Sequence, residues 1–270
     1  MSRPLVLLLL GLALLTLSSK VMAIVTRHDV PEQNFLLNEQ PAFLVDLPHE
    51  GHGVLIHPRW VLTVAHTVFY DYTGKVISVS GQDRKIVRVV IHAGYRLPDE
   101  SILSGDSARL MEFFRSRDDI ALIELDTPVT DVEPLALFTS QDEQGSRVVI
   151  MGRGATGNGR VGEIAETKGA MILRRCENRI VEARGNWLKY AFDHPDSAEP
   201  LEGMHGSGDS GGPLIIYLNG KPFLAGLSSW QYWAGELSDF RGGLYGAEAF
   251  QVRVSSYAHW IDSVLGETPN

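Results

Sequence analysis

Cysteine is almost absent from this sequence: its 270 residues include one, Cys176. A single thiol cannot form a disulfide within the chain, and it is too few for a zinc or iron–sulfur site built on thiolates. The stability of the folded chain must therefore come from its hydrophobic core rather than from covalent cross-links. We interpret Cys176 as a buried apolar residue rather than as a thiol nucleophile.

Basic residues, which would attract nucleic acid, are outnumbered by acidic ones. The chain has 24 Lys and Arg against 33 Asp and Glu, a formal net charge of −9 at pH 7. An acidic protein repels nucleic acid and anionic membranes, so we expect neither as a partner. His49, His52 and His57 lie close together in sequence, but their spacing matches no metal site. We expect no metal and no cofactor.

Long hydrophobic runs are missing except near the start of the chain. After Arg3, residues 4–17 form an apolar segment that is followed by a short polar stretch and by Val21 and Ala23. About 14 apolar residues fall short of the roughly 20 that a membrane-spanning helix needs. We interpret residues 1–23 as a secretory signal peptide that is cleaved after Ala23. The protein is then exported, to a periplasm or outside the cell, with no stable membrane anchor after cleavage.

The remaining residues, 24–270, consist mostly of short apolar and β-branched runs separated by Gly, Pro, Asn and Asp. Such runs predict an all-β barrel or sandwich. A polar link near residues 127–140 divides them into two halves of similar size, so we expect two β-barrels joined there. Tyr257, Trp260, Ile261 and Val264 recur at helical spacing and predict a C-terminal helix. A second short helix is expected after Ser107.

Three segments carry residues of catalytic type. His66 ends the apolar run WVLTVAH, Asp119 begins the run DDIALIEL, and Ser210 lies in the glycine-rich segment GDSGGP. A serine hydroxyl is a weak nucleophile at neutral pH and needs a base within hydrogen-bond distance, which an imidazole can supply. Glycines on both sides of Ser210 let backbone N–H groups approach a developing oxyanion, and we expect Gly208 and Ser210 to provide them.

In their order and spacing, these segments resemble the histidine, aspartate and serine motifs of the chymotrypsin/trypsin-like serine proteases. Weaker matches extend over most of the chain after residue 23, at Gly152–Gly154, at Ser228–Trp230 and at the terminal helix. The resemblance implies two packed six-stranded antiparallel β-barrels with a C-terminal helix. It also implies a serine endopeptidase acting on proteins or peptides, with Ser210 as nucleophile, His66 as base and Asp119 orienting the imidazole.

Cysteine positions of the family are where the sequence departs from it most clearly. Gly51, Thr67 and Gly206 stand where a disulfide-linked relative would carry cysteine. The sequence is similar in this respect to a bacterial-type member without disulfides.

The resemblance also suggests how the enzyme is activated. Family members are typically zymogens whose activation exposes an Ile-Val terminus, and the new ammonium group inserts beside the aspartate preceding the catalytic serine. Cleavage after Ala23 would expose Ile24 and Val25 directly. We therefore expect signal-peptide removal to mature the enzyme, and the Ile24 ammonium group to pair with Asp209 and shape the oxyanion hole. A buried carboxylate without a partner is costly, which gives this pairing a physical motive.

The specificity pocket of the family would be formed here by Met204, His205, Ser229, Trp230 and Gln231. Met204 stands where members that cleave after basic residues carry an aspartate, so it offers no counter-charge to Arg or Lys. A protonated His205 would favour an acidic substrate side chain, whereas a neutral one would only reduce the volume, and Gln231 would narrow the pocket. We expect a medium-sized apolar side chain before the cleaved bond, with an acidic one as second choice.

Two alternatives remain. The segment around Ser210 also fits the G-x-S-x-G elbow of α/β-hydrolase esterases, with Asp239 and His259 in that fold's order. That elbow lies between a strand and a helix, whereas Pro213 and an apolar strand-like run follow Ser210. The other alternative is a catalytically silent, protease-like binding protein, which would not need all three catalytic groups. The sequence does not indicate an oligomeric state.

Overall fold

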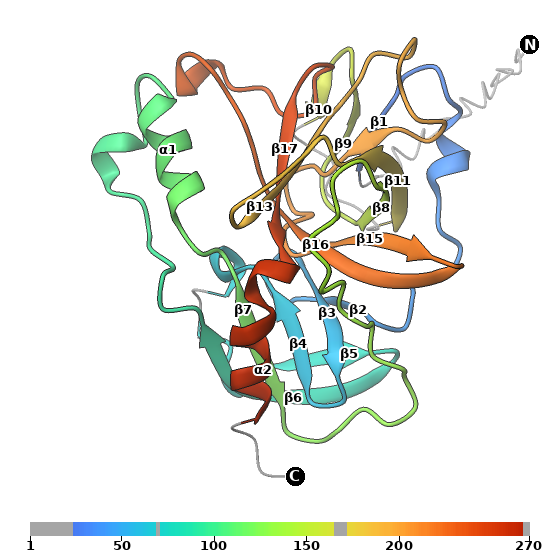
Figure 1. The fold of residues 1–270 in the computed structure, drawn as a ribbon, viewed down its shortest axis with the longest axis vertical. Helices are drawn as coiled ribbons and strands as arrows, with labels where there is room; N and C mark the ends of the chain where they lie inside the picture. Colours follow the sequence, from blue (N-terminus) through green and yellow to red (C-terminus); the bar gives the residue numbers. More distant parts are fainter. Residues whose placement is uncertain (1–23, 69–70, 165–171, 267–270) are drawn as a thin grey trace, which may run out of the picture.

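The computed structural model describes residues 24–68, 71–164 and 172–266, and the proposed signal peptide lies outside this part of the chain. The strands form a six-stranded, a seven-stranded and a four-stranded sheet (Figure 1). The two larger sheets occupy opposite halves of the molecule, and α2 (Ala258–Gly266) lies beside the six-stranded one (Figure 1). The all-β class and the C-terminal helix are thus confirmed.

The six-stranded sheet is antiparallel throughout and nearly closed, because its outer strands β2 and β5 lie in contact. Its order is β2 (Leu44–Asp46), β3 (His52–His57), β4 (Trp60–Thr63), β7 (Ala121–Leu125), β6 (Gln82–Ile91) and β5 (Val76–Val79). Side chains alternate along its strands. In β7, Ala121 and Ile123 enter the barrel core, whereas Leu122 joins the cluster that includes Ile261 of α2.

The second large sheet has seven strands in the described part of the chain, not the six expected. Its order is β11 (Arg174–Arg179), β8 (Arg147–Gly152), β15 (Pro213–Leu218), β16 (Lys221–Gln231), β17 (Glu248–Arg253), β13 (Trp187–Ala191) and β12 (Glu182–Arg184). The outermost strand β12 pairs with β13 alone. The two are joined by a two-residue turn in which Gly185 has φ +54°, a conformation that suits tight hairpins.

In the four-stranded sheet, the strand that begins at Ile24 pairs with Gly203–Met204, a few residues before Ser210. Its order is β10 (Gly162–Ile164), β9 (Thr156–Asn158), β1 (Ile24–Thr26) and β14 (Gly203–Met204). β1 runs antiparallel to β14 and parallel to β9. Ile24 is 1% exposed and packs in the core of the second half of the molecule.

Helices are few and short. The segment 92–120 between β6 and β7 contains η3 (Glu100–Ile102) and α1 (Ala108–Ser116), which confirms the helix expected after Ser107. The remaining 3-10 turns are η1 (Glu32–Phe35), η2 (Ala65–Thr67), η4 (Leu237–Asp239) and η5 (Val254–Tyr257). Within the described residues, no helix has the length and apolarity needed to cross a membrane.

Candidate active site

Two paired strands hold His66 and Asp119 next to each other. β4 and β7 are antiparallel neighbours in which Thr63 lies opposite Ala121. His66 lies in η2, just after β4, and Asp119 lies just before β7, so both residues leave the same end of the strand pair. Ser210 comes from the other large sheet, in the turn that leads into β15.

His66 forms hydrogen bonds with both other residues of the proposed triad. Its Nε2 atom is 2.8 Å from the Ser210 hydroxyl oxygen, and its Nδ1 atom is 2.7 Å from Asp119 Oδ2. The backbone N–H of His66 also donates to Asp119 Oδ1 at 2.9 Å. The structure thus brings all three residues into one hydrogen-bonded chain, with the imidazole between the carboxylate and the hydroxyl.

The Asp119 carboxylate is fully buried and receives further polar contacts. The Ser229 hydroxyl donates to Oδ2 at 2.6 Å, and the Arg117 guanidinium lies 3.4 Å from the same oxygen. Burial alone would raise the pKa of Asp119, but the charge and hydrogen bond of His66, with Arg117 and Ser229, outweigh it and hold that pKa well below its usual range. This carboxylate stays ionised at neutral pH.

Arg117 is a feature of the site that the sequence did not indicate. It is 5% exposed, and its guanidinium lies 4.6 Å from the ring centre of Phe114 and 5.3 Å from that of Tyr95. An arginine two residues before an aspartate is usually solvent-exposed, so no sequence signal marks it. Ser229, which we expected in the substrate pocket, donates its hydroxyl to Asp119.

The turn around Ser210 is held by close backbone contacts. The Ser210 carbonyl accepts a hydrogen bond from His52 N at 2.7 Å, and a Cβ on Gly51 would lie 2.7 Å from that carbonyl oxygen and 2.9 Å from Thr67 Cγ2. Gly51 therefore fits where a larger residue would not. Gly51 and Thr67, two of the positions where disulfide-linked relatives carry cysteine, thus lie next to each other. Gly208 has φ +90°. Within the described residues, the N–H groups of Gly208 and Ser210 donate to no other group.

Asp209 is the second fully buried carboxylate beside Ser210. Its oxygens accept hydrogen bonds from Gly154 N at 2.6 Å and Gly206 N at 2.8 Å, and His52 Nε2 lies 4.0 Å away. Burial raises the pKa of Asp209 to about 6, against the smaller lowering effects of His52 and of the two N–H groups, while Glu163 adds to the rise.

The expected partner of Asp209 has no ammonium group in this structure. Ile24 is preceded by residue 23, so it carries a peptide nitrogen, and it does not figure among the described contacts of Asp209. The pairing of Ile24 with Asp209 stays a prediction for the cleaved chain. His52 supports Asp209 from the other side: its ring is buried, bonded through Nδ1 to Asp46 at 3.0 Å and through Nε2 to Arg153 N at 3.1 Å.

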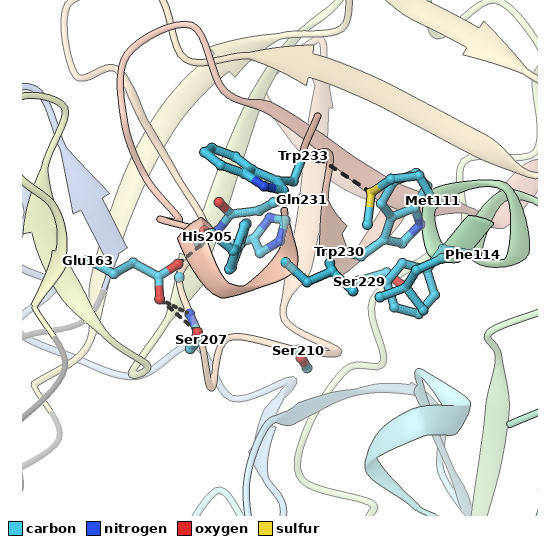
Figure 2. Close-up of a pocket in the computed structure, with 14 residues that line it drawn as sticks. Met111, Phe114, Glu163, His205, Ser207, Ser210, Ser229, Trp230, Gln231 and Trp233 are labelled. Atoms are coloured by element: carbon cyan, nitrogen blue, oxygen red, sulfur yellow. Dashed lines mark hydrogen bonds between the residues drawn. The ribbon is translucent and has the colours of Figure 1, made fainter. Parts of the chain in front are cut away.

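A cavity of about 300 Å³ opens beside Ser210 (Figure 2). Four of the expected pocket residues, His205, Ser229, Trp230 and Gln231, line it. Met204 does not; its side chain is fully buried in the core of the second half of the molecule, because β14 pairs with β1 there.

His205 is uncharged at neutral pH. It is 4% exposed, and its Nδ1 lies 3.1 Å from the Tyr190 hydroxyl and 3.0 Å from Gln251 Nε2. Burial, with a smaller contribution from the charge of His66, lowers the pKa of His205 to about 3. It therefore supplies no positive charge for an acidic substrate side chain at neutral pH.

Glu163 is a pocket residue that the sequence did not reveal. It reaches the cavity from β10, on the side opposite Met111 and Phe114 (Figure 2). Its Oε2 accepts from the Ser207 hydroxyl at 2.7 Å, and its Oε1 accepts from Gln231 Nε2 at 2.9 Å. No Lys or Arg of the described residues forms an ion pair with it.

The esterase alternative is wrong on both fold and geometry. Ser210 is followed by strand β15 rather than by a helix. Asp239 lies in η4 and His259 on the exposed side of α2, and the base bonded to Ser210 is His66.

Known proteins match nearly the whole described chain. A model of the trypsin family matches residues 25–261. Among curated proteins, the chain is 27% identical to vitamin K-dependent protein C of Rattus norvegicus and 27% identical to that of Mus musculus. Each comparison covers 80% of this chain and 46% of the relative, so the chain spans about half the length of these two relatives.

Proposed function

The chain belongs to the trypsin family of serine proteases, and from that premise we propose that it is an exported serine endopeptidase acting through an acyl-enzyme on Ser210. The observation that carries this proposal is the hydrogen-bonded chain from Asp119 through His66 to Ser210, with bonds of 2.7 and 2.8 Å. The proposed substrates are proteins or peptides, and the site as proposed needs no cofactor.

The reaction follows from that geometry. The Ser210 oxygen attacks the substrate carbonyl carbon while its proton passes to His66 Nε2, and the ionised Asp119 stabilises the imidazolium that forms. His66 then gives the proton to the leaving amine as the C–N bond breaks, which leaves an ester on Ser210. A water molecule, deprotonated by His66, releases the acid and restores the hydroxyl.

The oxyanion hole and the activation step complete the proposal. The N–H groups of Gly208 and Ser210 bind the negative oxygen that develops during attack. Removal of residues 1–23 frees the Ile24 ammonium group, which pairs with Asp209 and fixes the turn that carries both donors. Two observations support this step: Ile24 is already buried in β1, and no Lys or Arg in the described part of the chain forms an ion pair with the buried Asp209 carboxylate.

The pocket guides the proposed substrate preference. His205 is neutral and so offers an acidic side chain no counter-charge, and the carboxyl group of Glu163 lines the same cavity, so neither residue favours the acidic side chain that we expected as second choice. We keep the apolar side chain as the proposed residue before the cleaved bond, now without a role for Met204, which lies outside the cavity.

A fluorophosphonate probe tests this function, because it modifies a serine only when a base activates the hydroxyl. We expect stoichiometric labelling of the protein that begins at Ile24, located at Ser210 by peptide mass spectrometry, and none in Ser210→Ala. In His66→Ala the Ser210 hydroxyl is kept but its base is lost, so labelling should fall to background. An unlabelled Ser210 in the correctly processed protein would show a silent binding protein instead.

A further inference from the structure

Two loops from different halves of the molecule meet beside the cavity. Gly105–Ser107 precedes α1, and Gly235–Leu237 follows β16. They form one antiparallel bridge in which Asp106 lies opposite Glu236. Ser107 N donates to the Gly235 carbonyl and Leu237 N donates to the Gly105 carbonyl, each at 2.9 Å. We call these two segments the strap.

Side chains fasten the strap further. The Ser107 hydroxyl, 1% exposed as a residue, donates to the Trp233 carbonyl at 2.8 Å. The backbone N–H of Trp233 donates to the sulfur of Met111 at 3.4 Å (Figure 2). Two backbone hydrogen bonds, the Ser107 hydroxyl and Met111 of α1 thus connect the two loops. Apolar side chains of α1 and of the segment after β16 line the cavity beside the strap: Leu110, Met111, Phe114, Trp233, Leu237 and Phe240.

The position of His66 shows which part of a substrate the cavity receives. The leaving amine must face His66 Nε2 to take its proton. His66 is not among the residues that line the cavity, whereas Ser210 is. The leaving group therefore departs on the His66 side, and the residues on the N-terminal side of the cleaved bond occupy the cavity.

The free edge of β16 indicates where the substrate residues on the N-terminal side of the cleaved bond bind. β15 pairs with β16 only as far as Leu227, and β17 occupies the other edge. From Ser229 to Gln231 one edge of β16 thus has no partner strand in the described part of the chain. An extended peptide can add to such an edge. Three residues of strand cover about 10 Å, and just beyond Gln231 the same chain leads through Trp233 to the strap.

We propose that the strap ends the substrate site about three residues to the N-terminal side of the cleaved bond. A longer substrate must turn out of the cleft at this point, so its further residues add no binding. The inference rests on the proposed function, since it concerns the substrates of the same site.

A series of peptides of different length tests the limit. All members share the residues around the cleaved bond and carry one to six residues on its N-terminal side. We expect kcat/KM to rise up to the third residue and to stay within about twofold thereafter. A further rise of tenfold or more at the fourth and fifth residues would overturn the inference. Absence of cleavage at every length would count against the proposed function instead.

One substitution opens the strap with little disturbance. Leu237→Pro removes the N–H that donates to Gly105, and Leu237 is the first residue of η4, where proline is accepted. Glu236 has φ −65° and ψ 134°, which suits a residue before proline. Leu237→Ala is the matched control, because it loses the side chain but keeps the bond. In Leu237→Pro, but not in Leu237→Ala, we expect kcat/KM to be threefold to tenfold higher for peptides with four to six residues on the N-terminal side of the cleaved bond than for peptides with three.

A disulfide can lock the strap closed. Asp106 and Glu236 are directly opposite in a non-hydrogen-bonded pair, whose Cα atoms are about 4.5 Å apart, a separation that a disulfide spans. In Asp106→Cys with Glu236→Cys, the buried Cys176 offers no competing thiol. We expect the oxidised and reduced forms to cleave three-residue peptides equally. Loss of this activity on oxidation and its return on reduction would show that the strap must open, which contradicts the proposal.

Discussion

Asp119 and Asp209 are two fully buried carboxylates on either side of the same nucleophile, and their surroundings differ. Asp119 accepts four hydrogen bonds: two from His66, one from Ser229 and one, at 3.4 Å, from the Arg117 guanidinium. Asp209 accepts two backbone hydrogen bonds, and the nearest described imidazole nitrogen, His52 Nε2, lies 4.0 Å away. Their pKa values move in opposite directions, well below the usual range for Asp119 and up to about 6 for Asp209.

This difference shows that burial alone does not decide the charge of a carboxylate; its partners do. The half of the site around Asp119, which we propose moves the protons, already has its hydrogen-bonded chain in the uncleaved protein. Around Asp209, no Lys or Arg of the described residues pairs with the carboxylate, and we propose that the Ile24 ammonium group supplies the missing cation and so shapes the oxyanion hole. On this proposal, activity depends on the surroundings of Asp209, although the proposed proton-transfer residues lie around Asp119.

Removing the charge of Asp119 should have the largest effect. Asp119→Asn keeps the shape but presents an amide, so His66 is no longer held in the tautomer that leaves Nε2 free to accept a proton, and we expect kcat to fall by about 10⁴. Steady-state kinetics on a peptide substrate checks this, with urea unfolding as control for folding. A loss of less than tenfold would mean that this half of the site is not the proton-transfer unit.

Removing the charge of Asp209 should cost less. In the protein beginning at Ile24, Asp209→Asn deletes the ion pair and loosens the oxyanion turn, and we expect kcat to fall by about 10²–10³ while KM changes little. Asp83→Asn, at an exposed carboxylate of β6, is the matched control. An Asp209→Asn enzyme as active as that control would remove the role proposed for this carboxylate.

The pKa of Asp209 also predicts how stability depends on pH. Between its ordinary value of 3.8 and about 6, the uncleaved folded protein keeps a proton that the unfolded chain has released. Its stability should therefore fall as pH rises through this window, by about 3 kcal/mol. In the protein beginning at Ile24 the ammonium group stabilises the ionised form, so this loss should disappear.

Urea unfolding of both forms from pH 4 to pH 7 measures the difference. Comparing the two forms cancels the pH-dependent contributions to stability of the groups they share. One such group is Glu202, whose pKa is raised by burial to about 7. Asp209→Asn in the uncleaved form should abolish the same loss. Identical pH profiles for the cleaved and uncleaved proteins would contradict the account.

The smallest effect is expected at Ser229. Ser229→Ala removes one donor from Asp119 but leaves both bonds from His66, so we expect kcat to fall by about tenfold, the cost of one hydrogen bond to a charged group. Ser228→Ala is a close control, because the neighbouring hydroxyl is buried and has no partner among the described residues. Equal kinetics in the two variants would show that Ser229 does not support Asp119.

The fold and the geometry around Ser210 were largely predictable, because they rest on local patterns. Alternating apolar runs define strands, and the motifs around His66, Asp119 and Ser210 place each residue at the end of such a run. The seventh strand of the second sheet was missed, since β12 is only three residues long and depends on the turn at Gly185.

The pocket was less predictable, because it depends on contacts between distant segments. Met204 was expected in the pocket from its distance to Ser210, but pairing of β14 with β1 turns its side chain into the core. Glu163 reaches the pocket from β10, which no local pattern could show. The strap likewise joins residues 105–107 to residues 235–237, and neither segment carries a motif.

The rate of Ser210 labelling by a fluorophosphonate tests the central claim most directly, in two proteins that differ by one residue. One begins at Ile24 and the other keeps a single residue before it, which turns the ammonium group into a buried peptide bond and leaves Asp209 without its cation. We expect labelling to be at least about 100-fold slower in the extended protein, because oxyanion stabilisation is lost. Equal labelling rates in the two proteins would contradict it.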